Sequence, residues 1–585
     1  MTPSHPRPAG WSPLGALLVA LAVLAPPAAS AQGAPQELSI VAPVIACADL
    51  AQINLADIGG EGSQIAEAAE VTNDEGVATC SVRGTLAPAI TFAVVLPTEI
   101  WTQRYLQLGC GGLCGRLSID EVGAAFGCQV LNGGGFAVAA TDMGHQASDE
   151  TWGNDPQKRA DFAHRANHLT ALAAKRLIEA FYGQAPQFSY FTGCSDGGRE
   201  ALIAAQRYPG DFDGIIAGAP AANFQVQNSV YHAWQGVANR DADGKAILLA
   251  SRLPILHRAV LQACDGLDGL EDGLIANPLA CAFDPGTIQC EEGASDTSAC
   301  LTAAEMEVVR KLHDGPSDPT TGKRLTLGGP QWGSELRWTV FVPNTAGDST
   351  QSEDHAMEAI TGVSLPENPP EGFILADVTF DEGWLQQLAV LHPLYDATNP
   401  DLSGFQAAGG KLILYHGWSD TDISPLNTIA YHETVRARMG DEAAQAFMRL
   451  YLIPGMYHCS QGEGPYEFDL LSPMMAWVEG GQAPDVIVAR QPEAAEESGF
   501  GQFRGGPPGG EGTAVPLPGY PSASAVSANL VRSRPIYPYP ALPALTEGDD
   551  PDDAESWTLG ETTVTFSRPD WAGAGFFQPY EPLER

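Results

Sequence analysis

A serine lies between two glycines in the stretch Gly193-Cys194-Ser195-Asp196-Gly197, written GCSDG. A serine hydroxyl becomes a nucleophile when a neighbouring base takes its proton. The pattern G-x-S-x-G between a strand and a helix is typical of a sharp turn that exposes such a serine. We therefore expect Ser195 to be a nucleophile, with the backbone N–H of Asp196 stabilising an oxyanion.

Two later stretches offer the acid and the base that such a serine needs. Asp420 follows an apolar run in LILYHGWSDTD, and His458 follows the next apolar run in LYLIPGMYHCS. The order serine, aspartate, histidine, with the last two just past strand ends, is one known order for a catalytic triad. Asp422 is the alternative acid, but Asp420 lies closer to the strand end. We interpret His416 and His432 as structural residues.

Each member of the serine–histidine pair has a cysteine beside it, since Cys194 precedes Ser195 and Cys459 follows His458. If the serine and the histidine meet, the two cysteines lie close together as well. In an exported protein such a pair should form a disulfide. We expect Cys194–Cys459 to hold the base in position relative to the serine, because small misplacement of a base is costly. Two unrelated buried cysteines are the alternative.

A glycine-rich stretch, LQLGCGGLCGRLS at 106–118, is the candidate for a second oxyanion donor. Such a donor comes from an earlier strand-to-helix loop, and Gly111 or Gly112 would supply the N–H. A plain turn is an equally good interpretation of this stretch. His145 either lines the pocket or caps a strand end. With both donors in place, Ser195 would attack an ester carbonyl, and water would then release the acyl-enzyme.

Strand-like and helix-like stretches alternate around these residues. Their alternation predicts a parallel sheet covered by helices, which is an α/β fold. The pattern of apolar residues predicts strands at 90–97, 104–109, 134–145, 187–194, 212–221, 409–417 and 448–455, and helices at 165–183 and 197–209.

The alternation is interrupted between residues 223 and 391, which are rich in Gly, Pro, Asp and Cys. A chain of 585 residues is long enough for several domains or for one domain with an insertion. We expect an insertion: 32–225 and 392–585 form the two parts of the core, and 226–391 forms a lid domain. The Gly- and Pro-rich stretch 499–519 predicts a flexible surface loop.

The N-terminus has the features of a secretory signal peptide over residues 1–31. Arg7 is basic, residues 14–25 are apolar, and small residues at 29–31 suit a cleavage site. An uncleaved membrane anchor is the alternative, although the apolar run is short for a bilayer. The protein is therefore expected to be secreted or periplasmic.

Acidic residues outnumber basic ones by 71 to 30, and the net charge is -41. This balance argues against nucleic acid or an anionic membrane as a partner. The chain has 11 cysteines, an odd number, which in an exported protein indicates disulfides and at least one further thiol. The sequence does not indicate an oligomeric state.

The stretches GCSDGGREAL, QRYPGDFDGIIAGAPA, YHGWSD and YHC together resemble the tannase and feruloyl esterase family. This family also includes the enzyme that hydrolyses mono(2-hydroxyethyl) terephthalate. The resemblance extends from about residue 47 to about residue 557. It implies an α/β-hydrolase core with a large inserted lid and hydrolysis of small esters of aromatic, phenolic acids.

A second signature, CDGLDGLEDGLIANPLAC at 264–281, alternates acids and glycines as a calcium loop does, although an acidic surface turn is the alternative. It resembles the calcium loop of the family's lid, which implies a structural Ca²⁺ ion. The resemblance implies ligands at Asp265, Asp268, Leu270, Asp272 and Leu274, of which the leucines supply backbone carbonyls. It also implies disulfides Cys264–Cys281, Cys47–Cys80 and Cys290–Cys300, and it leaves the pairing of Cys110, Cys114 and Cys128 open.

The substrate pocket is expected to use residues of the lid. Trp332, Trp338 and Phe341 are candidates to stack on an aromatic ring, although lid core is the favoured interpretation of each one alone. Arg324 and Arg337 are candidates to pair with a substrate carboxylate. Ferulate, gallate and terephthalate esters are not distinguished by the sequence. A serine peptidase and a non-catalytic calcium-stabilised binding protein are the rival functions.

Overall fold

A computed structural model describes residues 1–2, 33–73, 76–119, 122–493, 517–521 and 526–584 of the chain. Most of the predicted signal peptide and most of the predicted loop at 499–519 lie outside these residues. Gln32–Arg585 form one structural unit.

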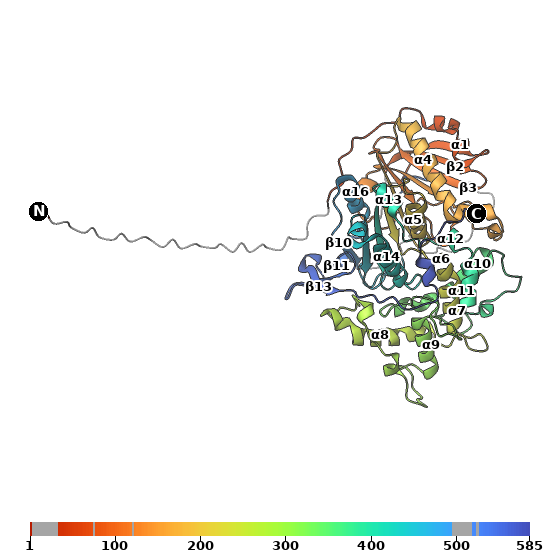
Figure 1. The fold of residues 1–585 in the computed structure, drawn as a ribbon, viewed down its shortest axis with the longest axis vertical. Helices are drawn as coiled ribbons and strands as arrows, with labels where there is room; N and C mark the ends of the chain where they lie inside the picture. The colour runs from red at the N-terminus through yellow and green to blue at the C-terminus, as the bar shows by residue number, and fades with distance from the viewer. Residues whose placement is uncertain (3–32, 74–75, 120–121, 494–516, 522–525, 585) are drawn as a thin grey trace. The chain divides into compact units, whose positions relative to one another are not determined.

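Nine strands of this unit form one sheet in the order β1-β2-β3-β5-β4-β6-β7-β8-β9 (Figure 1). The pairs from β1 to β3, and β3 with β5, are antiparallel, and the remaining pairs are parallel. Parallel strands all end at the same edge of a sheet, so the residues that follow them come together there. The strands are β1 Gln64–Thr72, β2 Ala78–Leu86, β3 Ile90–Pro97, β4 Arg104–Leu108, β5 Phe136–Thr141, β6 Phe188–Cys194, β7 Gly214–Gly218, β8 Lys411–Gly417 and β9 Met448–Ile453.

Both faces of the sheet are covered, because successive side chains of a strand point to opposite faces. In β3, Phe92 and Val94 pack into one hydrophobic cluster, together with residues of α4 (Ala166–Tyr182) and α5 (Asp196–Arg207). Ala93 and Val95 of the same strand pack into a second cluster, which contains residues of α16 (Leu471–Gly480). The sheet therefore lies between two layers of helices, as an α/β-hydrolase fold requires.

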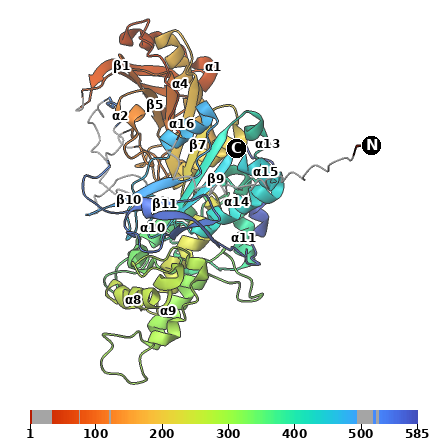
Figure 2. The same ribbon diagram turned by 90° about the vertical axis from the view of Figure 1, so that its left-hand side faces the viewer.

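Residues 226–391, which we call the lid segment, interrupt the core between β7 and β8. All of these residues are described, and none of them belongs to a named strand. They have a hydrophobic cluster of their own, and α8 and α9 lie side by side at the bottom of Figure 2. The helices of the segment are α7 Ala233–Ala238, α8 Leu253–Cys264, α9 Ala303–Asp314, α10 Gln351–Gly362 and α11 Glu382–Leu388, with η4 at Gln227–His232.

A longer helix, α14 Pro425–Met439, follows β8. Short helices connect the other elements: α1 Ala56–Gly59, α2 Gln129–Asn132, α3 Pro156–Ala160, α6 Phe224–Val226, α12 His392–Tyr395, α13 Ser403–Ala407 and α15 Asp441–Gln445.

Every strand and helix predicted from the apolar pattern is present, with ends shifted by a few residues. The sequence pattern missed β1 and β2, and it missed two small antiparallel sheets near the C-terminus. The stretch QIAEAAEVT of β1 is rich in alanine and glutamate, which favour helices, and it forms the mostly exposed edge of the sheet. The small sheets pair β10 Ile487–Pro492 with β11 Leu530–Ile536, and β12 Ala541–Leu545 with β13 Trp557–Thr563.

Five disulfides are present, and four of them are the expected pairs. The fifth joins Cys110 to Cys114, so these two of the three cysteines that the sequence left unassigned form a pair. Cys128 is a buried free thiol. Burial, together with the charge of Asp469, raises the pKa of this thiol to about 12, so it stays protonated and unreactive at neutral pH.

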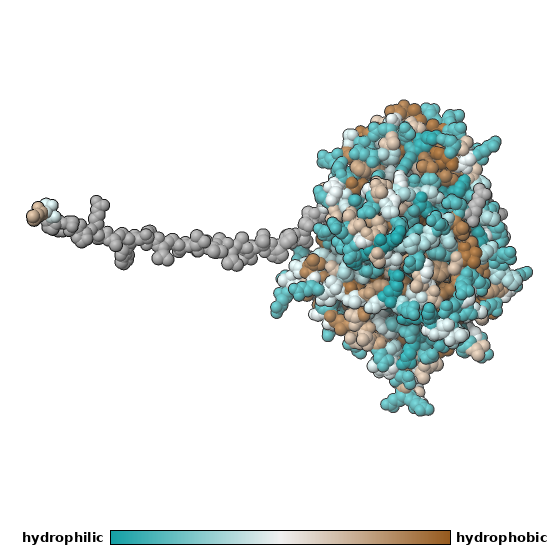
Figure 3. Space-filling view, viewed as in Figure 1, coloured by the Kyte–Doolittle hydropathy of each residue, from teal (hydrophilic) through white to brown (hydrophobic). Residues whose placement is uncertain are grey.

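Hydrophilic residues predominate on the face of the molecule drawn in Figure 3, and hydrophobic ones form small scattered patches. This surface agrees with the excess of acidic residues in the sequence. Within the described residues, every helix is too short or too polar to cross a membrane.

Candidate active site

Ser195 lies in the turn between β6 and α5, as the motif predicts. Its φ of 65° lies in the left-handed region, which a side chain other than glycine seldom adopts and which is common at functional sites. The turn is also tight, since a Cβ on Gly193 would lie 2.5 Å from the carbonyl oxygen of Gly197. The two glycines of the motif are therefore required by the close approach of the backbone.

His458 follows β9 and contacts the carboxylate of Asp420, which follows β8. Its Nδ1–H donates a hydrogen bond of 2.7 Å to Asp420 Oδ2, and both side chains are buried. Of the two candidate acids, the structure thus brings Asp420 to the histidine. Asp422 instead lines the pocket beside His458.

Asp420 is held by further hydrogen bonds. Its Oδ1 accepts bonds of 2.9 Å from the backbone N–H groups of Asp422 and Ile423. Its Oδ2 also lies 3.1 Å from Nε2 of His416, whose Nδ1 accepts a bond from Thr428. The sequence interpretation of His416 as structural missed this contact, although the spacing His-x-x-x-Asp after a strand was a signal for it.

The pKa values of this pair shift in opposite directions. Burial lowers the pKa of His458, but the charge of Asp420 and the hydrogen bond to it outweigh burial, and the net pKa lies above its ordinary value. Burial raises the pKa of Asp420, but the charge of His458 and the bonds from both histidines hold it well below its usual range. The pair therefore favours an imidazolium next to a carboxylate, which is the state a general base reaches after taking a proton.

The disulfide Cys194–Cys459 joins the serine turn to the histidine loop. The Cα atoms of the two cysteines are 6.0 Å apart, and 265 residues separate them in the sequence. Ser195 and His458 are the immediate neighbours of these cysteines, so the bond limits how far the two side chains can move apart.

Ser195 and His458 line one pocket, whose empty volume of about 710 Å³ includes open solvent at its mouth. The core contributes residues from the ends of the strands, and the lid segment contributes polar residues from η4 and α10. The core residues are Gly112, Leu113, Ser195, Asp196, Ala221, Phe224, Asp422, Ile423 and His458, and the facing residues are Gln227, Asn228, His232, Gln351, His355 and Glu358.

The loop after β4 reaches this pocket at Gly112 and Leu113, whereas Gly111 is not among the described lining residues. The Cys110–Cys114 disulfide closes the loop, and the carbonyl of Gly111 accepts a bond of 3.1 Å from the N–H of Cys114. Of the two glycines considered for the oxyanion, Gly112 is the one that borders the pocket, together with Asp196.

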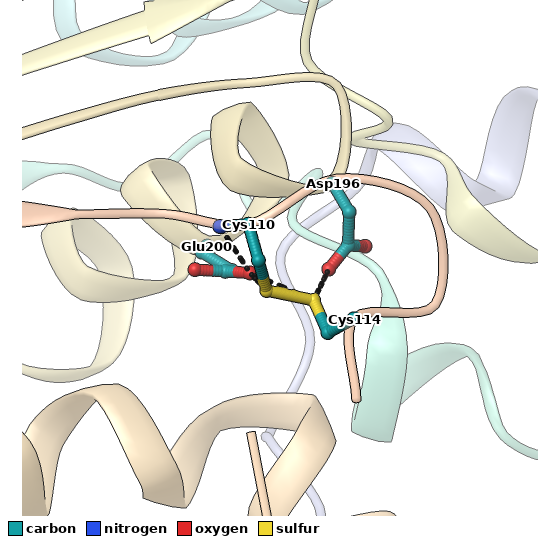
Figure 4. A group of neighbouring side chains, drawn as sticks. All are labelled: Cys110, Cys114, Asp196 and Glu200. Atoms are coloured by element: carbon teal, nitrogen blue, oxygen red, sulfur yellow. Dashed lines mark hydrogen bonds between the residues drawn. A yellow bond between two sulfur atoms is a disulfide. The ribbon is translucent and has the colours of Figure 1, made fainter. Parts of the chain in front are cut away.

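Glu200 of α5 lies against this disulfide, as Figure 4 shows. Its Oε1 is 2.8 Å from Sγ of Cys110. Burial, together with the charge of Asp196, raises the pKa of the Glu200 carboxyl to about 8. Cys110, Cys114, Asp196 and Glu200 come within 4.8 Å of one another, but the two sulfurs are bonded to each other and offer no thiolate to a metal.

A buried ion pair holds Asp196 at the start of α5. The guanidinium of Arg199 donates bonds of 2.6 and 3.0 Å to the two carboxylate oxygens of Asp196. It also donates to the backbone carbonyls of Phe162, Ala163 and Tyr395. Both side chains of the pair are almost completely buried, so a single network fixes the residue whose N–H is the candidate oxyanion donor.

The aromatic residues predicted to line the acyl pocket do not border it. Trp332, Trp338 and Phe341 are buried in the hydrophobic cluster of the lid segment. Trp332 stacks on His313 at a ring separation of 3.8 Å, and Trp338 packs on Phe341. Among the described residues they are lid core, which is the interpretation that the sequence analysis favoured for each of them alone.

The two arginines predicted to bind a carboxylate differ in position. Arg324 donates to the backbone carbonyl of Asp314 and is not among the described lining residues. Arg337 is likewise not among the described lining residues, but its Nη2 lies 4.0 Å from Oδ2 of Asp422, which lines the pocket. A substrate carboxylate near this arginine would therefore also lie near an acidic side chain.

His145 and His432 are buried, and neither is a described lining residue of the pocket. His145 stacks on Trp152 at a ring separation of 3.9 Å. His432 packs edge-on against Tyr539. Of the two interpretations of His145, the structure supports the one that does not place it in the pocket.

The loop expected to bind calcium brings Asp265, Asp268 and Asp272 into one short segment, which Cys264–Cys281 closes. Burial, with the charges of Asp272 and Asp265, raises the pKa of Asp268 to about 6. Such concentrated negative charge and oxygen donors suit a calcium ion. Asp272 also pairs with two arginines, Arg534 at 2.6 Å and Arg532 at 3.4 Å, which offset part of that charge.

Sequence reasoning missed the polar residues of the lid segment that face the serine. Gln351, His355 and Glu358 occupy positions i, i+4 and i+7 of α10, and this spacing places them on one face of the helix. The same spacing is common on solvated helices, so the sequence offered no signal that this face turns toward a pocket.

Most of the chain matches one known protein family. Residues 70–559 match the family described as tannase and feruloyl esterase. An uncharacterized esterase from Xanthomonas campestris is 34% identical over 494 residues, which are 76% of this chain and 84% of the relative. Mono(2-hydroxyethyl) terephthalate hydrolase from Piscinibacter sakaiensis is 32% identical over 537 residues, which are 79% and 81% of the two chains.

Solved structures show the same fold. An esterase from Aspergillus oryzae superposes with a TM-score of 0.73 at 25% identity, covering 88% of this chain and 99% of its own. Feruloyl esterase B from the same organism has a TM-score of 0.71 at 24% identity and covers 88% and 100%. These comparisons agree with the large sheet and the flanking helices described above.

Proposed function

The chain belongs to the tannase and feruloyl esterase family and is a carboxylic-ester hydrolase, and from this premise we propose that it hydrolyses small esters of phenolic acids through Ser195, His458 and Asp420. The observation that carries the proposal is one pocket lined by Ser195 and His458, with Asp420 2.7 Å behind the histidine. Names of relatives, among them a probable feruloyl esterase B-2 of Aspergillus flavus, support the aromatic acyl group.

In the proposed mechanism His458 removes the proton of the Ser195 hydroxyl through Nε2, while its Nδ1–H stays bonded to Asp420. The serine oxygen attacks the ester carbonyl, and the oxyanion is stabilised by backbone N–H groups of Asp196 and of the loop at Gly112. His458 then returns the proton to the leaving alcohol. Water, activated by the same histidine, hydrolyses the acyl-enzyme and frees the acid and the serine.

A hydrolase of mono(2-hydroxyethyl) terephthalate is the second candidate, because a relative carries that name and Arg337 lies 4.0 Å from Asp422, a lining residue of the pocket. The Asp422 carboxylate next to Arg337 disfavours a substrate that carries its own carboxylate. We therefore place uncharged phenolic esters first. Two rival functions are a serine peptidase, which would cleave amides, and a binding protein without catalytic activity. The assay described below distinguishes both from an esterase.

We also propose that the loop of Asp265, Asp268 and Asp272 binds a structural calcium ion, with backbone carbonyls of Leu270 and Leu274. The three carboxylates of one disulfide-closed loop support it, as does the pKa of Asp268, which burial and the charges of Asp272 and Asp265 raise to about 6. The ion would supply charge compensation to the loop and no chemistry to the reaction, because none of these residues is a described lining residue of the serine pocket.

Export from the cytosol, with removal of residues 1–31, is likewise proposed. Its support is the N-terminal sequence and the five disulfides, which form and persist in oxidising compartments. We propose no nucleic acid or membrane partner, since the chain carries a net charge of -41.

A substrate panel tests the proposed function. Purified protein in calcium-containing buffer should hydrolyse methyl ferulate and methyl gallate faster than mono(2-hydroxyethyl) terephthalate, and it should not hydrolyse the matching amides. Chromatography of the released acids gives kcat/KM for each. Cleavage of the amides at comparable rates would favour a peptidase, and the absence of any turnover or fluorophosphonate labelling would favour a binding protein.

Removing the disulfide beside the active site should reduce turnover more than it reduces folding. The double variant Cys194→Ala/Cys459→Ala frees the histidine loop from the serine turn, and a shift of about 1 Å in a reacting group lowers the rate by about 100-fold. We expect kcat to fall by about that factor in protein that still shows the native circular dichroism spectrum at the assay temperature.

The matched control is Cys290→Ala/Cys300→Ala, which removes a disulfide of the lid segment. Neither of these cysteines is a described lining residue of the pocket, so kcat should stay within a few-fold of the original value. Equal losses of kcat in the two double variants would contradict the positional role of Cys194–Cys459.

A further inference from the structure

Glu200 is a buried acid next to the active site that the proposed mechanism does not use. It lies on α5, four residues after Asp196, and it contacts the loop after β4 that carries Gly112. Only 2% of the residue is exposed. A buried carboxyl group is unfavourable without hydrogen-bond partners, so the groups that bond to it indicate what it holds in place.

The loop after β4 lies directly on the first turns of α5. A Cβ on Gly197 would lie 2.9 Å from the carbonyl oxygen of Cys110, and a Cβ on Gly109 would lie 2.6 Å from the Cα of Gly197. Neither position has room for a side chain, so backbone packs on backbone here. The disulfide from Cys110 to Cys114 closes the loop, and Gly112 lies between the two cysteines. A shift of Cys110 against α5 would therefore also move Gly112.

Glu200 supplies the hydrogen-bond acceptor at this contact, as Figure 4 shows. Its Oε1 accepts a bond of 3.3 Å from the backbone N–H of Cys110. Its Oε2 accepts a bond of 2.7 Å from Nδ2 of Asn167 on α4. Burial, with the charge of Asp196, raises the pKa of the carboxyl to about 8, but both oxygens can accept these bonds whether or not the proton is bound.

A buried chain of hydrogen bonds fixes the direction of the Asn167 amide. The hydroxyl of Tyr105 donates a bond of 2.6 Å to Oε1 of Gln107. Nε2 of Gln107 then donates to the side-chain oxygen of Asn167 at 2.8 Å and to its backbone carbonyl at 3.0 Å. Because the side-chain oxygen of Asn167 faces Gln107, its NH₂ group must face Glu200. The side chain at position 200 therefore needs two acceptors, one for α4 and one for the loop.

We propose that Glu200 is a positioning residue for the oxyanion hole: through the N–H of Cys110 it holds the loop where Gly112 can stabilise the oxyanion. This inference rests on the proposed ester hydrolysis at Ser195, and it adds a residue that is not among the described lining residues of the pocket. Charge on the carbonyl oxygen develops in the transition state. A displaced donor should therefore lower kcat and leave KM nearly unchanged.

Glu200→Gln tests this role because it keeps the size of the side chain and replaces one acceptor by an NH₂ group. Since Asn167 presents a donor, the new amide turns its oxygen to Asn167 and its NH₂ group meets the N–H of Cys110. We expect kcat for methyl ferulate to fall by about 10- to 100-fold, as for a displacement of up to about 1 Å at the reacting centre. Burst titration of Ser195 counts the competent sites, so unfolded protein does not affect kcat.

Exchanging the amide and the carboxyl group should restore turnover. In Glu200→Gln/Asn167→Asp, the carboxylate at position 167 accepts from Gln107 and from the NH₂ group at position 200. The amide oxygen at position 200 then accepts the N–H of Cys110, so kcat should return to within a few-fold of the original. If Glu200→Gln does not fold, Glu200→Asp replaces it: its carboxylate is one methylene too short to reach Cys110, and kcat should fall in the same way.

The matched control is Glu479→Gln, which alters another buried acid of the core. Glu479 bonds to Arg104 and to the hydroxyl of Tyr190 and is not a described lining residue of the pocket. This variant should lose stability, because it weakens a buried ion pair, but its kcat per titrated site should stay within a few-fold of the original.

A transition-state analogue separates positioning from a general structural effect. In the trifluoromethyl ketone related to methyl ferulate, the Ser195 oxygen bonds to the carbonyl carbon, the π electron pair becomes the oxyanion, and the serine proton moves to His458. Glu200→Gln should raise the inhibition constant of this ketone by the factor by which it lowers kcat/KM. The inhibition constant of ferulate, which forms no such oxyanion, should not change.

Three results would overturn the proposal. They are an unchanged kcat in Glu200→Gln, a double variant no more active than the single one, and equal weakening of ketone and ferulate binding. Failure of the proposed function looks different, since the unaltered protein itself would then show no turnover of methyl ferulate.

Discussion

Replacement of Ser195 by alanine should lower kcat for methyl gallate by about 10⁴- to 10⁶-fold while leaving the protein folded. The variant keeps the histidine, the acid and the backbone N–H groups, but it has no oxygen to form the acyl-enzyme. The residual rate would come from water that binds in place of the serine hydroxyl. Turnover assays at equal concentrations of folded protein measure the loss.

Ser189 provides a matched control, because it lies on the same strand, β6, and is buried. Ser189→Ala should keep kcat within a few-fold of the original. A fluorophosphonate probe should label the original protein and the Ser189 variant but not the Ser195 variant. Turnover by Ser195→Ala at an unreduced rate would exclude a serine nucleophile at this turn.

Replacement of Arg199 by methionine should lower the free energy of unfolding by about 3–5 kcal/mol, the range for breaking a buried ion pair from one side. Asp196 would keep its charge in a buried site, and the three carbonyls that Arg199 bonds would lose their donor. Methionine fills a similar volume, so the effect reports polar groups rather than a cavity. Urea unfolding followed by fluorescence measures the change.

The control for Arg199 is Arg176→Met, which breaks the exposed ion pair with Asp57. Water and salt already screen that pair, so its loss should change the midpoint of unfolding far less. If the two variants unfold at the same urea concentration, the Arg199–Asp196 pair does not contribute the stability assigned to it.

The core of the fold was predictable because its strands are buried on both faces and read as continuous apolar runs. The runs at Ile90–Pro97 and Lys411–Gly417 are of this kind, and both strands appear where the sequence placed them. The edge strand Gln64–Thr72 was not predictable, since its residues favour helix and it is ordered mainly by pairing with β2.

The site was predictable where residue types constrain one another. The adjacency of Cys194 to Ser195 and of Cys459 to His458 indicated a contact that neither cysteine indicates alone. The polar face of α10 had no such second signal, because the direction of a helix face depends on its tertiary neighbours.

The aromatic residues of the lid segment show where residue types leave two roles open. The run of Trp332, Trp338 and Phe341 suggested a ring-binding surface, but aromatic side chains bury more area than other residues and fill a core equally well. The lid segment has no strand in any named sheet, so helices and large side chains must supply its core. Composition alone does not separate these two roles.

The covalent path through Cys194 and Cys459 has a consequence for the integrity of the molecule. Together with the backbone between them, this bond makes a ring that contains the whole lid segment. A protease that cuts one peptide bond anywhere in that ring opens it but releases neither piece. The nicked molecule would still migrate as one species until a reductant is added, with the nucleophile on one fragment and the imidazole on the other.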